Sequence, residues 1–481
     1  MTQAVAVPLW LFVLLCALAL LAVLQWLLLP GLRWYFRRKV RGVMDEISVR
    51  LNIEIPPFKL TRRQALIDRL VTDPRVLLAV QQHASQQQLS QEVVLQQAHR
   101  YAREIVPAFN AYLYFRLGYW LARKFARLLY RVRLGTLEAE ALGRIDPRST
   151  VVFVMNHRSN MDYVLVAFLA AERVALSYAV GEWARVWPLQ SLIRAMGAYF
   201  VRRNSGDPLY RMVLQRYVQM ATEGGVPQAV FLEGGLTTDG LLRAPKLGLL
   251  DYMLKNFDPA GERDLVFVPV GINYDRVFED RTLLARHEPG AARAGVLRAM
   301  RVIAAYLGRQ FLRRLQGRSY RNGYACVNFG QPLSMAERVR ATGIDLRTLD
   351  DTARHAAVAH LGEELMDRIG GIVPALPVPL VATVLLRNAD TPMSELDLKA
   401  ALNTLIHAIE AAGAHVYVPR ADLDYALDVG LRMLTLRRMV TQEDGLLRVN
   451  PAELPALRYY ANSIEHLCRR VDVPWIAAAP R

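Results

Sequence analysis

Short runs of apolar residues, separated by longer helical stretches, fill the middle of the chain between residues 136 and 335. Runs that are apolar at successive positions are typical of strands buried on both faces of a sheet. Strands that alternate with helices indicate an α/β domain with a mixed or parallel sheet flanked by helices. The predicted strands are residues 151–155, 175–180, 229–232, 265–272 and 324–329.

The N-terminal end carries a much longer apolar run. From Ala4 to Leu24 no charged or strongly polar residue occurs, and as a helix this run would be about 31 Å long, enough to cross a bilayer. A secretory signal is the alternative, but no positive charge precedes the run. We expect residues 1–41 to form a membrane anchor, and the positive-inside rule places the catalytic part on the cytoplasmic side of the inner membrane. The basic flank behind this expectation is Arg33, Arg37, Arg38, Lys39 and Arg41.

Mainly helical regions are expected on both sides of the α/β domain, at residues 42–135 and 336–481. In the first, the segment 109–133 is dense in aromatic and basic residues, a composition that suits a helix at a membrane interface. From this segment alone, an ordinary solvated basic face fits equally well, but the predicted anchor favours an amphipathic membrane-facing helix. In the second, residues 446–449 are expected to form a short strand. The arginines predicted to share one face of the first helix are Arg116, Arg123, Arg127 and Arg131.

The charge balance narrows the choice of partners. The 481 residues include 60 Lys and Arg against 44 Asp and Glu, a net charge of +16. This predicts attraction to anionic membrane lipids, a phosphorylated substrate or nucleic acid. No recognised nucleic-acid-binding motif is present, so we expect no nucleic-acid partner. The three cysteines, Cys16, Cys326 and Cys468, lack the spacing of a metal site, and we expect no metal and no cofactor.

The candidate chemistry begins just after the predicted strand 151–155, where His157 precedes Asp162 by five positions. Residues five apart lie roughly 140° apart on an ideal helix and would not face each other. We therefore expect a bend, with Ser159 or Asn160 as N-cap and Asp162 in the first turn of the next helix. The carboxylate could then accept the imidazole N–H and leave the other ring nitrogen as a base. For these two residues alone, a solvated loop is the alternative.

Two clusters further along have the composition that a phosphate and acyl site needs. Arg202 and Arg203 end an apolar stretch, and adjacent residues point in different directions. We expect one arginine to reach the site while the other pairs locally. Val268, Pro269 and Val270 lie in an apolar strand that would wall an acyl pocket.

A third cluster lies between these two in the sequence. Glu233, Gly234 and Gly235 follow the predicted strand 229–232, at the edge where open α/β sheets bind ligands. The two glycines allow close approach of the backbone and offer N–H groups to an anion. Lys246, a little further on, is an additional candidate cation.

Together these blocks resemble the glycerolipid acyltransferases, whose hallmark is a His and an Asp separated by four residues. His157 and Asp162 match that hallmark, and the later clusters follow in the family's order. The chain is most similar to the bacterial PlsB-type glycerol-3-phosphate acyltransferases. That resemblance also covers Leu-Thr-Arg-Arg-Gln at 60–64, His-Arg-Ser-Asn-Met-Asp-Tyr at 157–163 and Leu-Arg-Tyr-Tyr-Ala-Asn-Ser-Ile-Glu-His-Leu at 457–467.

The resemblance implies an acyltransferase domain at residues 136–335. It further implies membrane-bound 1-O-acylation of glycerol-3-phosphate by acyl-CoA or acyl-carrier protein, giving lysophosphatidic acid for phospholipid synthesis. His157 would be the general base and Asp162 its orienting partner, with direct transfer and no acyl-enzyme. Glu233, Gly234 and Gly235 would form the floor of the acceptor site. The remaining substrate-binding candidates are Arg158, Ser159, Arg202, Arg203 and Lys246.

One block departs from the family pattern. The family continues Glu-Gly-Gly with Arg-Ser-Arg, whereas this chain has Leu236-Thr237-Thr238. Loss of a charge-assisted phosphate contact costs about 1.5–3 kcal/mol, or roughly ten- to a hundredfold in affinity. Either Arg243 or Arg158 compensates, or the acceptor is a lysophospholipid, dihydroxyacetone phosphate or an unphosphorylated alcohol. A non-catalytic lipid-binding relative is a further alternative.

Overall fold

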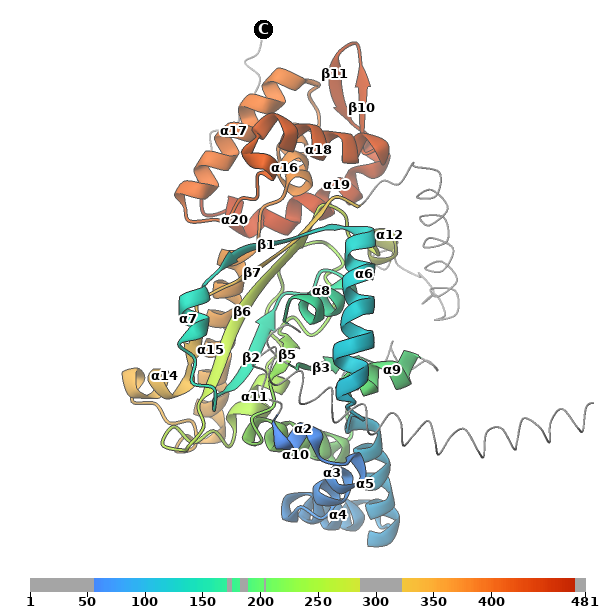
Figure 1. The fold of residues 1–481 in the computed structure, drawn as a ribbon, viewed down its shortest axis with the longest axis vertical. Coiled ribbons are helices and arrows are strands. Elements are labelled where there is room, and N and C mark those ends of the chain that lie inside the picture. The colour runs from blue at the N-terminus through green and yellow to red at the C-terminus, as the bar shows by residue number, and fades with distance from the viewer. Residues whose placement is uncertain (1–55, 171–174, 182–188, 203–204, 286–321, 472–481) are drawn as a thin grey trace, which may run out of the picture.

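The computed structural model describes residues 56–170, 175–181, 189–202, 205–285 and 322–471 (Figure 1). The predicted anchor, residues 1–41, and Arg203 lie outside these ranges. Within the described ranges, no helix is long and apolar enough to cross a bilayer. N-terminal helices lie at one end of the molecule, a sheet occupies the middle, and the C-terminal region lies at the other end (Figure 1).

The centre of the molecule is an eight-stranded mixed sheet with the order β1-β7-β6-β2-β5-β3-β4, and β8 pairs with β6 off this path. Neighbouring strands are parallel except where β7 and β8 run antiparallel to β6. All five predicted strands are confirmed, and β1, β4 and β8 were not foreseen. The strands are β1 (Arg131–Leu137), β2 (Thr150–Met155), β3 (Ser177–Val180), β4 (Tyr199–Phe200), β5 (Gln228–Phe231), β6 (Leu265–Tyr274), β7 (Tyr324–Phe329) and β8 (Leu333–Ser334).

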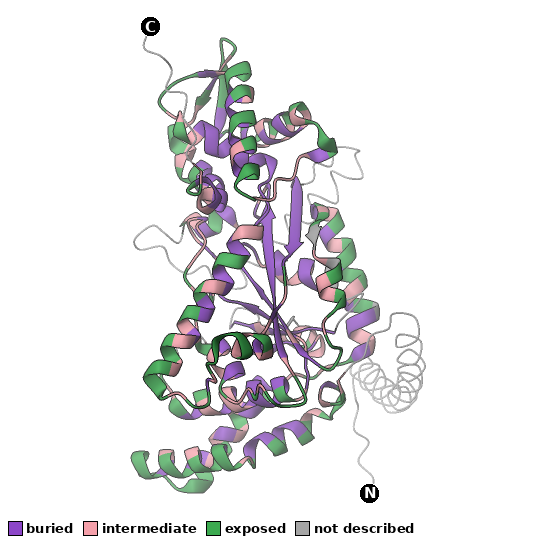
Figure 2. Cartoon of the chain, turned by 90° about the vertical axis from the view of Figure 1, so that its left-hand side faces the viewer, coloured by how far each residue is buried: buried purple, intermediate pink, exposed green. Residues whose placement is uncertain are grey.

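Each face of the sheet has its own apolar cluster, because successive side chains of a strand point to opposite faces. In β2, Val152 and Val154 belong to one cluster, whereas Phe153 and Met155 belong to the other. Strand β6 is buried at every position, as expected of an apolar strand in a sheet covered on both faces. Figure 2 shows most of the sheet buried, and the edge strand β1 is the exception, because Arg131, Arg133 and Leu134 are exposed.

Helices from different parts of the chain cover the two faces. The face of Val152 and Val154 is covered by α3 (Arg63–Val71), α4 (Pro74–Gln87), α5 (Gln91–Ile105), α10 (Pro208–Glu223), α11 (Gly248–Leu254) and α15 (Asp351–Ile372). The face of Phe153 and Met155 is covered by α6 (Tyr119–Leu129), α8 (Met161–Ala170), α16 (Pro377–Arg387) and α19 (Leu454–Ala461). Shorter helices include α2 (Pro57–Leu60), η1 (Leu113–Gly118), α7 (Ala139–Gly143), α9 (Leu189–Ala195), α12 (Asp280–Ala285) and α14 (Met335–Thr342).

The predicted helix over residues 109–133 is wrong at its C-terminal end. Helix α6 ends at Leu129, and Arg131 is the first residue of β1, where its side chain donates to the hydroxyls of Tyr324 and Tyr425 at 3.3 and 2.9 Å. Pairing with β7 decides this, because it satisfies the backbone N–H and C=O groups of a segment whose side chains also fit a helix. Whether α6 faces a membrane stays a prediction.

The C-terminal region is mainly helical, as predicted, and contains α17 (Glu395–Ala411), α18 (Leu423–Leu436) and α20 (Glu465–Cys468) besides α16 and α19. A small sheet of β10 (Val440–Glu443), β11 (Leu446–Val449) and β9 (Met393–Ser394) projects from it (Figure 1). Strand β11 coincides with the predicted strand. Asp444 and Gly445, with φ of 52° and 77°, form the tight turn of this hairpin. Single turns η3 (Pro419–Ala421), η4 (Pro451–Glu453) and η5 (Asn462–Ile464) connect the helices.

Close packing of α15 on β6 predicts that Gly271 tolerates no side chain. A Cβ at Gly271 would lie 2.4 Å from the carbonyl oxygen of Ile372, so Gly271→Ala should lower the free energy of unfolding by about 1–3 kcal/mol. Gly248→Ala is the matched control, because a Cβ there meets no atom within 4 Å. Urea unfolding of the two variants checks this, and equal midpoints would contradict it.

Candidate active site

His157 and Asp162 meet at the carboxyl end of β2. The strand ends at Met155, α8 begins at Met161, and Asp162 lies in the first turn of α8. His157 folds back from the intervening loop, and its Nδ1 lies 2.9 Å from Oδ2 of Asp162. The two side chains are only 2% and 0% exposed. The predicted bend is therefore present, and the solvated-loop alternative is excluded.

The Asp162 carboxylate is held on both oxygens. Oδ2 also accepts from the backbone N–H groups of Arg158 and Ser159 at 2.7 and 3.0 Å. Oδ1 accepts from the hydroxyl of Tyr274 at 2.5 Å. Since an ionised carboxylate only accepts hydrogen bonds, Nδ1 of His157 carries the proton and Nε2 is the basic nitrogen. The arrangement is that of a general base, His157, whose ring is oriented by the carboxylate of Asp162.

The imidazole is also fixed by rings and backbone. Phe231, the last residue of β5, stacks on it with ring centroids 3.9 Å apart and an interplanar angle of 22°. Tyr163 approaches edge-on, with centroids 5.5 Å apart at 87°. Ahead of the loop, the amide of Asn156 makes a reciprocal pair with the backbone of Ile272 at 2.9 and 2.8 Å. This pair locks the end of β2 to β6.

Glu233 lies beside His157 and is almost fully buried. Its Oε1 accepts from the backbone N–H of His157 at 3.0 Å, while among the described residues Oε2 has no hydrogen-bond partner. Burial raises the pKa of Glu233 to about 7, and the opposing contributions include the N–H of His157 and the charges of Arg158 and Arg243. A carboxyl poised in this way can bind a substrate hydroxyl as donor or as acceptor.

Two cationic side chains, Lys246 and Arg243, lie at the rim of the site, which is formed by the turn that follows Glu233. Gly234 has φ of 67°, and a Cβ there would lie 2.7 Å from Cγ of Lys246, so the exposed Lys246 side chain passes directly over it. The guanidinium of Arg243 donates to the Thr238 hydroxyl at 2.8 Å. The structure therefore places a positive charge at position 238, although the residue itself is a threonine.

Arg158 and Ser159 bind other parts of the protein. The Arg158 guanidinium, 2% exposed, donates to the carbonyls of Gly240 and of Ser463, the latter at 2.7 Å. The Ser159 hydroxyl donates to Glu279 at 2.6 Å. Their predicted substrate contacts stay predictions, but both side chains already have clear structural functions.

Arg202 forms a bidentate ion pair with Glu104 at 2.8 and 2.6 Å. It also lies 5.0 Å from the ring centroids of both Tyr101 and Tyr210. Of the predicted arginine pair, Arg202 is thus the member that pairs locally. No contact of Arg202 tests its expected role in phosphate binding.

The predicted acyl wall is deeply buried. Val268 and Val270 are 0% exposed and pack in the cluster that contains Phe231. The carbonyl of Pro269 accepts from the N–H of Gly330 at 2.9 Å. These residues lie near the base, and their acyl contact stays a prediction.

Tyr274, Phe231 and the C-terminal segment 457–467 contribute to the site although the sequence alone did not indicate a role for them. The side chain of Asn462 donates to the carbonyl of Asp239 at 2.8 Å, and a Cβ at Gly240 would lie 2.0 Å from the carbonyl oxygen of Tyr459. The segment therefore packs directly on the loop that follows Glu233. The one indication in the sequence that this segment belongs to the site was its resemblance to the acyltransferase family. Within the described residues, no group of His, Cys, Asp or Glu could hold a metal ion.

Comparison with known proteins agrees with this geometry. Residues 137–273 match the acyltransferase family model, and residues 309–470 match the model of the glycerol-3-phosphate acyltransferase C-terminal region. The chain is therefore similar to the glycerol-3-phosphate acyltransferases. The predicted family resemblance is thereby confirmed, whereas the predicted bounds of the acyltransferase domain stay a prediction.

Curated relatives extend this similarity over most of the chain. The glycerol-3-phosphate acyltransferase of Aeromonas hydrophila subsp. hydrophila is 29% identical over 427 residues, covering 85% of this chain and 50% of the relative. That of Pseudomonas fluorescens strain SBW25 is 26% identical over 422 residues, covering 85% and 48%. The chain thus spans about half the length of the curated relatives it matches.

Among solved structures, the 1-acyl-sn-glycerophosphate (LPA) acyltransferase PlsC from Thermotoga maritima overlaps 53% of this chain and 80% of its own, at 18% identity and a TM-score of 0.30.

The buried carboxyl of Glu233 predicts a pH-dependent stability. Its ordinary pKa is 4.5 and its folded-state pKa is about 7, so between these values the folded state binds more protons than the unfolded chain. Stability contributed by this group therefore falls as the pH rises from about 4.5 to about 7, by on the order of 3 kcal/mol. Glu233→Gln keeps the acceptor for the His157 N–H but cannot titrate, so its stability should fall less over this range. Urea unfolding of the parent protein and of Glu233→Gln at pH 5 and pH 8 checks this. An equal fall in the free energy of unfolding of both proteins would contradict the raised pKa of Glu233.

Proposed function

We propose that this chain is a membrane-bound glycerol-3-phosphate 1-O-acyltransferase that makes lysophosphatidic acid for phospholipid synthesis. The observation that carries the proposal is the buried His157–Asp162 pair beside Glu233, with Arg243 and Lys246 at the rim. The curated relatives that match most of the chain are named glycerol-3-phosphate acyltransferase, which supports the same reading.

In the proposed reaction, Nε2 of His157 removes the proton from the acceptor hydroxyl. The oxygen attacks the carbonyl carbon of the acyl thioester, and a tetrahedral intermediate forms. When the C–S bond breaks, the thiolate leaves and takes the proton from the imidazolium. Asp162 stabilises that imidazolium through Nδ1. Acyl transfer is direct, so no acyl-enzyme is required.

The acceptor phosphate would be bound by Arg243 and Lys246. The family arginines are absent at positions 236 and 238, and Leu236 packs partly buried against the cluster that contains Phe231. Arg243 nevertheless brings a guanidinium to the hydroxyl of Thr238. Of the two compensating arginines considered from the sequence, Arg158 is buried against two carbonyls, so Arg243 is the better candidate.

The membrane part of the proposal rests on the sequence. The apolar run from Ala4 to Leu24 would anchor the chain in the inner membrane, and its basic flank would keep the catalytic domain on the cytoplasmic side. Anionic lipids would attract that flank. The donor would be acyl-CoA or acyl-carrier protein, whose reactive thioester is the same.

A second candidate is the same chemistry on another acceptor, and Leu236 and Thr238 favour it because they carry no charge. A panel of glycerol-3-phosphate, dihydroxyacetone phosphate, lysophospholipid and glycerol, each supplied with labelled acyl-CoA, separates the two. Label on glycerol-3-phosphate at position 1 supports the first proposal. Label only on another acceptor supports the second.

Loss of the base should abolish transfer. We expect His157→Ala to lower kcat by at least about a hundredfold, measured as labelled product from full-length enzyme in membranes. His355→Ala is the matched control, since His355 is exposed on α15, and it should retain full activity. Undiminished turnover by His157→Ala would overturn the assignment of the base.

Loss of the rim charge should weaken binding of a phosphorylated acceptor. We expect Arg243→Met to raise the KM for glycerol-3-phosphate roughly ten- to a hundredfold while kcat changes less. Arg340→Met, at an exposed position of α14, is the control. An unchanged KM would show that the phosphate is bound elsewhere.

A further inference from the structure

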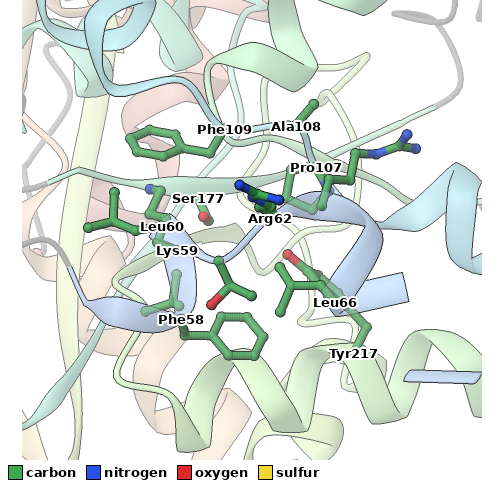
Figure 3. A pocket seen from close by; sticks show the side chains of 13 residues that line it. Phe58, Lys59, Leu60, Arg62, Leu66, Pro107, Ala108, Phe109, Ser177 and Tyr217 are labelled. Carbon is green, nitrogen blue, oxygen red and sulfur yellow. The ribbon is translucent and has the colours of Figure 1, made fainter. Parts of the chain in front are cut away.

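A cavity separate from the His157 site lies where β3 and β5 begin, at the opposite end of these strands from His157. It has a volume of about 520 Å³ and is bounded by α2, the segment 107–109, Tyr217 of α10 and Ser177, the first residue of β3 (Figure 3). Ser177 pairs with Gln228 at the start of β5, whereas Phe231 at the end of β5 stacks on His157. The cavity and His157 are therefore separated by the length of β5 from Gln228 to Phe231, about 10 Å.

Lys59 is the unusual residue of this cavity. It is 7% exposed, and its Nζ donates to the carbonyl of Ala175 at 2.6 Å. The ammonium lies 4.5 and 5.6 Å from the ring centroids of Phe109 and Tyr114. Among the described residues, no carboxylate forms an ion pair with it. Burial of the group lowers the pKa of Lys59 well below its usual value, because it disfavours the protonated form.

Such a group favours an anion in the cavity. A buried ammonium is expensive unless it is paired and hydrogen-bonded, and one backbone carbonyl and two aromatic faces satisfy only part of its capacity. An anion placed beside Lys59 would restore the charged form and satisfy its remaining donors.

The rest of the lining is cationic at the surface and apolar inside. Arg62 lines the cavity and is exposed. Phe58, Leu66 and Phe109 supply apolar surface, and Figure 3 shows Lys59, Ser177 and Arg62 between the rings of Phe109 and Phe58. The volume falls in the range of about 300–1,000 Å³ of small-molecule sites. A purely ionic ligand would leave the aromatic walls unused, and a neutral lipid would leave Lys59 unpaired.

We propose that this cavity binds a single-chain anionic amphiphile, with its carboxylate or phosphate at Lys59 and Arg62 and the first part of its acyl chain between Phe58 and Phe109. Both fatty acids and lysophospholipids present this chemistry. The site uses no residue of the His157 region, so it does not depend on the proposed acyl transfer.

Direct binding to the full-length chain tests this. The probes are oleate, 1-oleoyl lysophosphatidate and, as the uncharged match, 1-oleoylglycerol, measured in the His157→Ala background so that nothing is consumed. Lys59→Met should raise the Kd of the anionic probes at least about tenfold and leave 1-oleoylglycerol unchanged. Lys255→Met, at an exposed position, should bind like the parent. If oleate binds more tightly than lysophosphatidate, the natural ligand carries a carboxylate. If lysophosphatidate binds more tightly, the natural ligand carries a phosphate.

Because Lys59 is buried, a second variant and a second readout accompany it. Arg62→Gln changes an exposed side chain and should weaken anionic probes severalfold without unfolding the protein. A photoreactive fatty acid should crosslink to peptides of residues 56–66 or 107–109. Equal binding of the neutral and anionic probes, unchanged Kd in both variants, or crosslinking confined to the loop around His157 would each overturn the proposal.

Discussion

Four hydrogen-bond donors converge on the carboxylate of Asp162, namely the imidazole of His157, the backbone N–H groups of Arg158 and Ser159, and the hydroxyl of Tyr274. Three of them come from the loop after β2, and the fourth comes from the end of β6. Met155 pairs with Val270, so β6 continues past the end of β2 and carries Tyr274 over the start of α8. A slip of one residue between these strands would turn Tyr274 to the other face. The orientation of the His157 imidazole thus depends on the register of the sheet.

The C-terminal region is part of the same construction. Arg158 follows His157 directly, and its buried guanidinium is held by carbonyls of Gly240 and Ser463. Asn273, next to Tyr274, donates to the carbonyl of Pro374 at 2.9 Å and to the hydroxyl of Ser463 at 3.3 Å. The loop that carries His157 is therefore tied to a segment some three hundred positions later in the chain. Removing that segment would leave the buried guanidinium of Arg158 with the carbonyl of Gly240 as its one remaining acceptor of the two.

The strands and the pairing of His157 with Asp162 could be predicted because both depend on residues that are close together in the sequence. A continuous apolar run fixes β2, and a five-residue spacing forces the bend between His157 and Asp162. Features that depend on distant partners could not be foreseen. Arg131 leaves the helical pattern because β7 pairs with it, Arg202 is taken by Glu104, and the contact of Tyr274 with Asp162 requires the β2–β6 register. In each case a residue far along the chain selects among roles that the local sequence leaves open.

The charges in the proposed acceptor site would separate the binding of the phosphate from the hydrogen bonding of the substrate oxygen. Burial keeps Glu233 partly protonated near neutral pH, and a bound phosphate would raise its pKa further, which favours the form that donates to a substrate oxygen. An ionised carboxylate at that depth would instead repel the phosphate. The cations lie at the rim, where Arg243 bonds Thr238 and Lys246 passes over Gly234. Charge at the rim would attract the phosphate, while Asp162, hydrogen-bonded to Nδ1, would stabilise the imidazolium of His157. The absence of arginine at positions 236 and 238 therefore changes which residue carries the charge while leaving a charge at that place.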